Sequence, residues 1–113
     1  MKQYLVNQKI LRIYINDSDM IDGEPLWQYI MHKTQEQGLA GATVFKGVAG
    51  IGANSQMHTF EIWALSQQLP IVIEIIDDED KIINFLNNNE DAIQEGLVTI
   101  QTLEVLRFKH KST

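Results

Sequence analysis

The chain has 113 residues, a length that fits one domain with a core of its own. Hydrophobic residues make up 44% and charged residues 21%, a composition that excludes wholesale disorder. Fifteen acidic against nine basic residues give a net charge of -6, which repels a phosphate backbone, so we expect no nucleic-acid partner. The absence of cysteine excludes disulfides, thiolate metal sites and a cysteine nucleophile.

No segment of the sequence predicts insertion in a membrane. The apolar runs are far shorter than the ~20 residues of a spanning helix, and the opening MKQYLVNQK lacks the apolar core of a secretory signal. We therefore expect a cytoplasmic protein, folded as a single domain over residues 1–113 with a loose tail at 109–113.

The first half of the chain predicts a strand, a helix and a second strand. The first strand has one apolar face, formed by the alternating residues Leu11, Ile13 and Ile15. A helix is expected to begin near Pro25 and to stop at Gly38. Its buried face is predicted to hold Leu26, Ile30 and Thr34. The second strand covers about 40–48.

A long loop over residues 50–66 opens the second half, and its length favours a functional role. The following segment, 70–76, is apolar almost throughout, as in a central strand buried on both sides. The acids from Asp77 to Asp80 suit the positive end of a helix. That helix is expected to break near 87–89, end by Gly96 and bury Ile82, Phe85 and Leu86. A last strand includes 103–108.

This order of elements predicts an α+β ferredoxin-like βαββαβ sandwich, a four-stranded antiparallel sheet with two helices on one face. The other face of the sheet is then left bare. Its apolar residues favour self-association, and they are Ile10, Tyr14, Val72 and Ile76. In this topology Arg12 and Glu74 can pair across the bare face.

The segment KGVAGIG, which begins at Lys46, is a candidate anion site. Gly47, Gly50 and Gly52 could present backbone N–H groups to a phosphate, with the Lys46 ammonium adding charge. The segment lacks both the Walker ending and the distal acid of a dinucleotide fingerprint. The alternative is that the glycines accommodate a bulge or bend where the strand leaves the sheet.

The histidines and acids do not predict a metal or catalytic site. His58 could donate to a phosphate or simply bond nearby loop backbone. His32 and His110 have no partner at metal-ligand spacing, and the 77–80 acids lack the glycine of a cation loop. No serine lies in a nucleophile elbow, so we predict neither catalytic residues nor a resident cofactor.

Four segments resemble the bacterial family called domain of unknown function 190. They are LRIYI at 11–15, LAGATVFKGVAGIGA at 39–53, HT at 58–59 and LPIVIEIID at 69–77. The resemblance implies the ferredoxin-like fold of P-II signalling proteins, which form trimers and bind adenine nucleotides between subunits beneath a long loop. P-II proteins carry a glycine-rich phosphate loop with a lysine before the last strand. Here residues 87–99 hold Gly96 alone and no lysine.

The resulting hypothesis is a homotrimeric P-II-like signalling or regulatory protein that binds a small anionic ligand, an adenine nucleotide, at subunit interfaces. It would dock on an unidentified protein partner through its loop. The candidate ligand-binding residues are Lys46, Gly47, Gly50, Gly52, His58 and, from a neighbouring subunit, Arg107. The alternative is a small enzyme or metal-handling protein on the same fold. Acylphosphatases share the sandwich, but the first loop here, 16–24, lacks their signature arginine.

Overall fold

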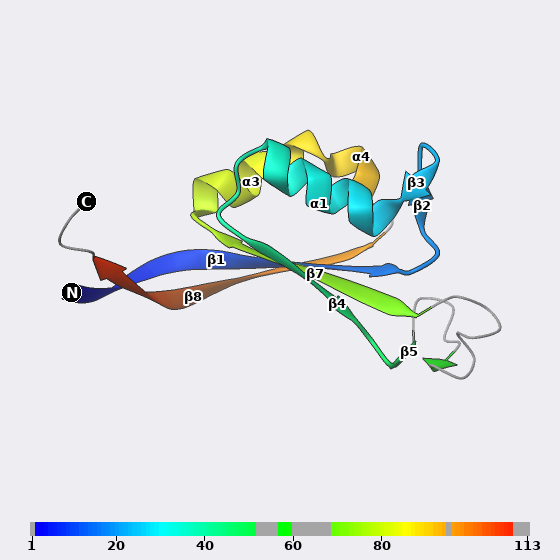
Figure 1. The fold of residues 1–113 in the computed structure, drawn as a ribbon, viewed down its shortest axis with the longest axis horizontal. Coiled ribbons are helices and arrows are strands. Elements are labelled where there is room, and N and C mark those ends of the chain that lie inside the picture. Colours follow the sequence, from blue (N-terminus) through cyan, green and yellow to red (C-terminus); the bar gives the residue numbers. More distant parts are fainter. Residues whose placement is uncertain (1, 52–56, 60–68, 95, 110–113) are drawn as a thin grey trace.

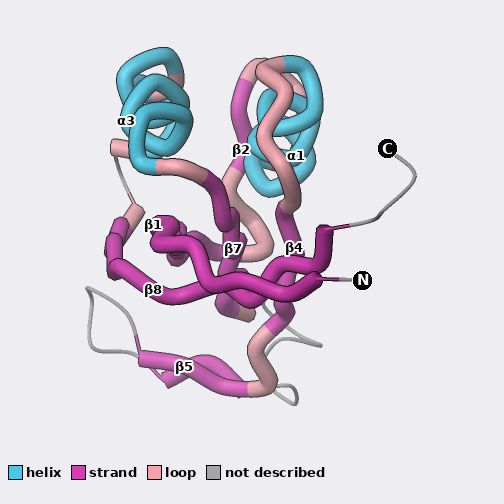
Figure 2. The backbone as a smooth tube through the Cα atoms, turned by 90° about the vertical axis from the view of Figure 1, so that its left-hand side faces the viewer, coloured by secondary structure: helices cyan, strands magenta, loops and turns pink. Residues whose placement is uncertain are grey.

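A computed structural model describes residues 2–51, 57–59, 69–94 and 96–109 (Figure 1). Its main sheet is antiparallel and has the order β4-β7-β1-β8. The four strands are β1 (Lys2–Asn16), β4 (Ala42–Lys46), β7 (Pro70–Asp77) and β8 (Leu97–Lys109). The helices α1 (Leu26–Glu36), α3 (Glu79–Asn88) and α4 (Glu90–Ile93) all lie on one face of this sheet (Figure 2). The predicted ferredoxin-like sandwich is confirmed.

The core lies between the sheet and the helices. Alternation places every second residue on the helix side, and from Leu11 onward in β1 and along β7 these side chains are buried. The sheet contributes Leu11, Ile13, Ile15, Ile71, Ile73 and Ile75, and the helices contribute Leu26, Ile30, Ile82 and Phe85. The strand β7 is central, as predicted, but only its helix side is fully buried, because Val72, Glu74 and Ile76 are half-buried on the other side.

The helix ends follow the predicted signals. The helix α1 ends two residues before Gly38, whose φ of 72° is a left-handed conformation that glycine adopts without strain. The interruption predicted near 87–89 is confirmed at Asn89, whose buried side chain donates to the Phe85 carbonyl at 2.8 Å. None of the helices in the described part of the chain is long and apolar enough to cross a membrane.

Two short hairpins extend from the sandwich. The strand β2 (Met20–Ile21) pairs with β3 (Glu24–Pro25) just before α1. The strand β5 (Ala49–Ile51) pairs with β6 (Met57–Thr59) below the sheet (Figure 2). The second hairpin belongs to the long connection between β4 and β7, so part of the predicted loop is ordered as strand.

The strands β1 and β8 are longer than the sequence predicted. The pairing of β1 with β7 begins at Lys9, whereas its pairing with β8 begins at Lys2. Residues 2–8 and 103–109 therefore form a two-stranded extension, called the ribbon below. Figure 1 shows the ribbon projecting beyond the helices at the end where both termini lie. It contributes to an elongated shape of 53 × 26 × 22 Å.

Candidate functional site

Three segments meet where the long connection leaves and re-enters the sheet. The Lys46 ammonium lies 3.0 Å from a carboxylate oxygen of Asp17, which follows β1. The Asp17 N–H donates to the Leu69 carbonyl at 2.8 Å, and the Gly47 N–H donates to the Pro70 carbonyl at 2.8 Å. The two roots of the connection are therefore held against each other and against the end of β1. This region is called the loop base.

Among the described residues, the loop base carries the Lys46–Asp17 ion pair, and the Asp19 carboxylate accepts from the neighbouring Asn16 N–H at 2.9 Å. Lys46 pairs with Ile71 in the sheet register, which places it on the helix side. Its side chain is 45% exposed and that of Asp17 is 19% exposed, so solvent screens the ion pair. An anion that approaches Lys46 also meets the Asp17 carboxylate. Asp17 was not a candidate from sequence, because only the strand order brings it beside Lys46.

Glycine at two positions of the loop base allows close approach to a proline ring. A Cβ atom added at Gly47 would lie 2.7 Å from Cγ of Pro70, and one added at Gly50 would lie 2.9 Å from the same atom. Such contacts are shorter than real Cβ atoms tolerate, and the ring cannot swing away. Packing against Pro70 therefore explains both glycines, in agreement with the alternative that they serve backbone geometry. A ligand role for them stays a prediction.

Gly47→Ala is expected to lower the free energy of unfolding by about 1–3 kcal/mol, because the added methyl group overpacks against Pro70. Gly41→Ala is the matched control, since a Cβ atom there meets no other atom within 4 Å and its φ is not positive. Urea denaturation of both variants measures the difference. Equal stability of the two variants would contradict the role given to the Pro70 contact.

The remaining candidate residues are divided between two ends of the molecule. His58 pairs with Gly50 in the β5–β6 hairpin, so its backbone lies close to the loop base. Gly52 lies outside the described residues. Arg107 lies in the ribbon, opposite Tyr4. From Tyr4 to the end of β1 at Asn16 the strand covers roughly 40 Å at ~3.3 Å per residue, so one copy cannot place Arg107 beside Lys46.

A buried amide holds Arg107 at the root of the ribbon. The Arg107 guanidinium donates to the side-chain oxygen of Gln8 at 3.2 Å, and the Gln8 amide donates to the Asp78 carboxylate at 2.9 Å. Gln8 is buried, so the two bonds satisfy the oxygen and nitrogen of its own amide, whereas Arg107 and Asp78 are exposed. The three side chains form one network that joins the ribbon to the start of α3. Sequence patterns did not indicate it, because its members are far apart along the chain.

A separate pocket of about 380 Å³ lies between α3, α4 and the start of β8. It is lined by Leu86, Asn87, Glu90, Ile93, Gln94, Gly96 and Val98. These residues supply an apolar surface, two amides and one carboxylate, and no basic side chain. The pocket is thus poorly suited to a phosphate. Its lining residues belong largely to the segment before the last strand, which is where the resemblance to P-II proteins implies a glycine-rich phosphate loop.

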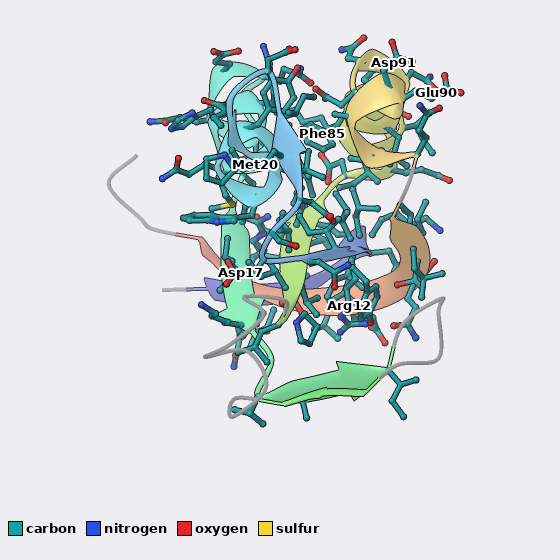
Figure 3. The ribbon with its side chains drawn as sticks, turned by 90° about the vertical axis from the view of Figure 1, so that its right-hand side faces the viewer. Arg12, Asp17, Met20, Phe85, Glu90 and Asp91 are labelled. Carbon is teal, nitrogen blue, oxygen red and sulfur yellow. The ribbon has the colours of Figure 1, made fainter. Side chains whose placement is uncertain are left out.

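The sheet face opposite the helices carries the predicted ion pair. The Arg12 guanidinium lies 3.2 Å from the Glu74 carboxylate and also donates to the Gln101 side chain at 2.8 Å. Figure 3 shows Arg12 on this face and Phe85 on the helix side. Ile10 is buried, and Val72 and Ile76 are half-buried, so the face is less exposed than the sequence predicted. Among the described residues, its most exposed large apolar side chains are Tyr4, Tyr14, Phe45 and Leu97.

Another lysine ion pair lies on α1, away from the loop base. On α1 the Lys33 ammonium is 3.2 Å from the Glu36 carboxylate and also lies over the Tyr29 ring. The hydrogen bond to Glu36 raises the pKa of Lys33, because it stabilises the charged ammonium. Within the described ranges, no three histidine or acidic side chains are grouped so that they could hold a metal ion.

Comparison with known structures supports the fold assigned above. CPII from Thiomonas intermedia K12, a nitrogen regulatory PII-like protein bound to ADP, AMP and bicarbonate, superposes with a TM-score of 0.70 at 16% identity, covering 90% of this chain and 91% of CPII. The GlnK–ATP complex of B. subtilis gives a TM-score of 0.50 at 9% identity, covering 86% and 82% of the two chains. At these identities the likeness concerns the fold.

Sequence comparison identifies the family. A UPF0166 protein of Aquifex aeolicus (strain VF5) is 36% identical over 102 residues, which cover 90% of this chain and 96% of the relative. A UPF0166 protein of Methanocaldococcus jannaschii is 35% identical over 104 residues, covering 91% and 95%. The family model DUF190, described as an uncharacterized ACR, matches residues 8–105. The chain therefore belongs to the DUF190 family, and its fold is that of PII-like proteins.

Proposed function

We propose that this protein is a cytoplasmic, homotrimeric P-II-like regulatory protein, folded as a single domain over residues 1–113. It binds a small anionic ligand, an adenine nucleotide, in clefts between subunits, and it docks on a protein partner through the loop at 50–66. The observation that supports this function most is the shared fold with CPII, a PII-like protein bound to ADP, AMP and bicarbonate.

A cleft between subunits explains the placement of the candidate cations. Lys46 lies at the loop base and Arg107 in the ribbon, roughly 40 Å apart along β1. A ligand the size of a nucleotide cannot touch both within one copy. In an assembly, the ribbon of one copy can lie beside the loop base of a second copy, so that Arg107 of the first approaches Lys46 of the second. The trimer therefore completes a site that one chain holds in two parts.

The electrostatics at the loop base make the site responsive to ligand. The whole chain has a net charge of -6, so each cation near the ligand has a large share in attracting it. Lys46 is paired with Asp17, 3.0 Å away, and a bound phosphate or carboxylate competes with that acid for the ammonium. Because Asp17 also bonds the Leu69 backbone, this competition acts at the root of the loop.

Lys46→Ala is expected to weaken nucleotide binding on the order of tenfold to a hundredfold, because a charge-assisted hydrogen bond contributes about 1.5–3 kcal/mol. Folding should change little, since the Lys46 side chain is 45% exposed and solvent screens its ion pair. Calorimetry with ADP measures the affinity. Lys33→Ala is the matched control, because it removes another lysine of an ion pair, on α1 and away from the loop base. Equal affinity of the two variants would place the ligand elsewhere.

A thermal-shift screen of the wild-type protein tests the ligand class. Adenine nucleotides are expected to raise the melting temperature, and the rise should grow with the logarithm of their concentration above the dissociation constant, because a ligand that binds only the folded state stabilises it. Bicarbonate, divalent cations and simple phosphate esters complete the screen. Stabilisation by none of the anions would overturn the ligand proposal, and release of phosphate from the nucleotide would favour the enzymatic alternative.

A further inference from the structure

The pocket between α3, α4 and the start of β8 has no role in the proposed function. Its volume of about 380 Å³ lies within the range of ligand sites, about 300–1,000 Å³. The helical lining residues, at 86, 87, 90, 93 and 94, recur every three or four positions, so the two helices present them on one side. Gly96 and Val98 complete the lining from the chain that enters β8, an edge strand. The pocket therefore lies at one edge of the main sheet.

The floor of the pocket is apolar and fixed in place. Ile93 is buried in the core cluster, and Leu86 and Val98 pack against the same cluster. The backbone at Gly96 is pressed against the sheet, because a Cβ atom added there would lie 2.9 Å from the Tyr14 carbonyl oxygen. The floor thus offers a preformed surface to a hydrocarbon or aromatic group.

The polar groups of the lining attract a cation. Glu90 supplies a carboxylate, and the amides of Asn87 and Gln94 supply acceptor oxygens. Residues 82–106 include four acids and no basic residue. The last turn of α3 also has no basic side chain to offset the negative end of the helix dipole. Figure 3 shows Glu90 and its neighbour Asp91 on α4, above the start of β8.

We infer that this pocket binds a small organic cation, an ammonium group carried on an apolar body. The Glu90 carboxylate receives the ammonium, the amide oxygens accept its remaining N–H groups, and the body lies on Leu86 and Ile93. A hard metal ion fits less well, because it needs six or more oxygen ligands and the floor supplies none. A phosphate or carboxylate ligand is repelled by Glu90.

The pocket is separate from the loop base. Both lie at the end of the sheet where β1 ends, since Leu97 pairs with Tyr14 and Lys46 pairs with Ile71. Lys46 is on β4, however, and β8 is the opposite edge strand. Three strand spacings of ~4.8 Å put the two edges roughly 14 Å apart. Occupancy of the pocket therefore does not block the loop base, and the two sites can be tested independently.

Three probes of nearly the same shape test the charge preference of the pocket. They are phenethylammonium, the neutral 2-phenylethanol and the anionic phenylacetate, each titrated into the full chain while backbone amide resonances are followed by NMR. The ammonium is expected to bind on the order of tenfold more tightly than the alcohol, and phenylacetate more weakly than both. The shifted resonances should gather around residues 86–98. Equal affinities for the ammonium and the alcohol, or shifts centred elsewhere, would overturn the inference.

Charge substitutions assign the preference to Glu90. Glu90→Gln keeps the shape and removes the charge, so the roughly tenfold preference for the ammonium should disappear while affinity for the alcohol stays. Glu90→Lys is expected to reverse the order and favour phenylacetate. Asp91→Asn is the matched control, because Asp91 is the adjacent exposed acid and does not line the pocket.

Circular dichroism checks that these variants stay folded, and both substituted positions are exposed. Retention of the preference in Glu90→Gln, or its equal loss in Asp91→Asn, would assign it to the overall negative charge of the chain and refute the pocket as a cation site. A wild-type protein that prefers the ammonium but does not bind ADP would count against the proposed function alone.

Discussion

Ile82→Ala is expected to lower the free energy of unfolding by about 2–5 kcal/mol. Ile82 is fully buried on the sheet side of α3, within the cluster that includes Leu11 and Phe85. Removing its outer carbons forfeits burial and leaves a cavity that the rigid sheet below cannot fill. A domain of this size is stable by about 5–15 kcal/mol, so the loss is a large part of the total.

The neighbouring residue provides the control. Ile83 lies on the same helix and is 43% exposed, so Ile83→Ala removes the same atoms from a position half open to water. That change is expected to cost less than about 1 kcal/mol. Urea denaturation of both variants, with the slope checked for two-state behaviour, gives the comparison. A similar loss in the two variants would mean that α3 does not present Ile82 to the core.

Asp77→Ala is expected to lower the free energy of unfolding by about 2–4 kcal/mol. Asp77 is buried at the end of β7, and its carboxylate accepts from the Ala40 N–H at 2.8 Å and from the Asp78 N–H at 2.7 Å. It thus joins the connection after α1 to the start of α3. Each hydrogen bond to a charged group contributes about 1.5–3 kcal/mol, and the truncation removes the acceptor for both N–H groups.

Asp80→Ala is the matched control for this carboxylate. Asp80 is exposed in the first turn of α3, where the interaction of its charge with the positive end of the helix contributes about 0.3–1 kcal/mol. Thermal and urea unfolding of the two variants should differ clearly. If Asp80→Ala proved as destabilising as Asp77→Ala, the charge at the helix terminus rather than the buried bonds would account for both losses.

Local patterns predicted the sandwich because its core is periodic. The alternation around Leu11 and the helical spacing of Leu26 and Ile30 each specify one buried face, and the order of elements then leaves few topologies. The ribbon was missed for the same reason. Its first strand passes through Asn7, Gln8 and Lys9, which break the apolar alternation. This segment is a strand because β8 pairs with it. The paired residues lie near opposite ends of the sequence, so no local pattern indicates the pairing.

The candidate site was predictable in its glycines and its lysine, but not in their partners. Composition indicated that Gly47 and Gly50 have a special backbone role, yet the reason is the ring of Pro70, which follows β4 by more than twenty residues. The pairing of Lys46 with Asp17 likewise depends on the sheet order. A single sequence shows which residues are candidates for a special role. The contacts that explain the role come from residues that are distant in the sequence.

Because of the loop base, the length of the long connection has little effect on the stability of the fold. Gly47 and Pro70 are joined by a hydrogen bond, so the chain between them leaves and returns at a closed joint. The entropy of closing such a joint grows only with the logarithm of the loop length, and doubling the loop costs about 0.6 kcal/mol. Insertions between these two residues are thus cheap for the sandwich. Evolution can remodel this segment for new binding partners while the sheet, the helices and the joint stay as they are.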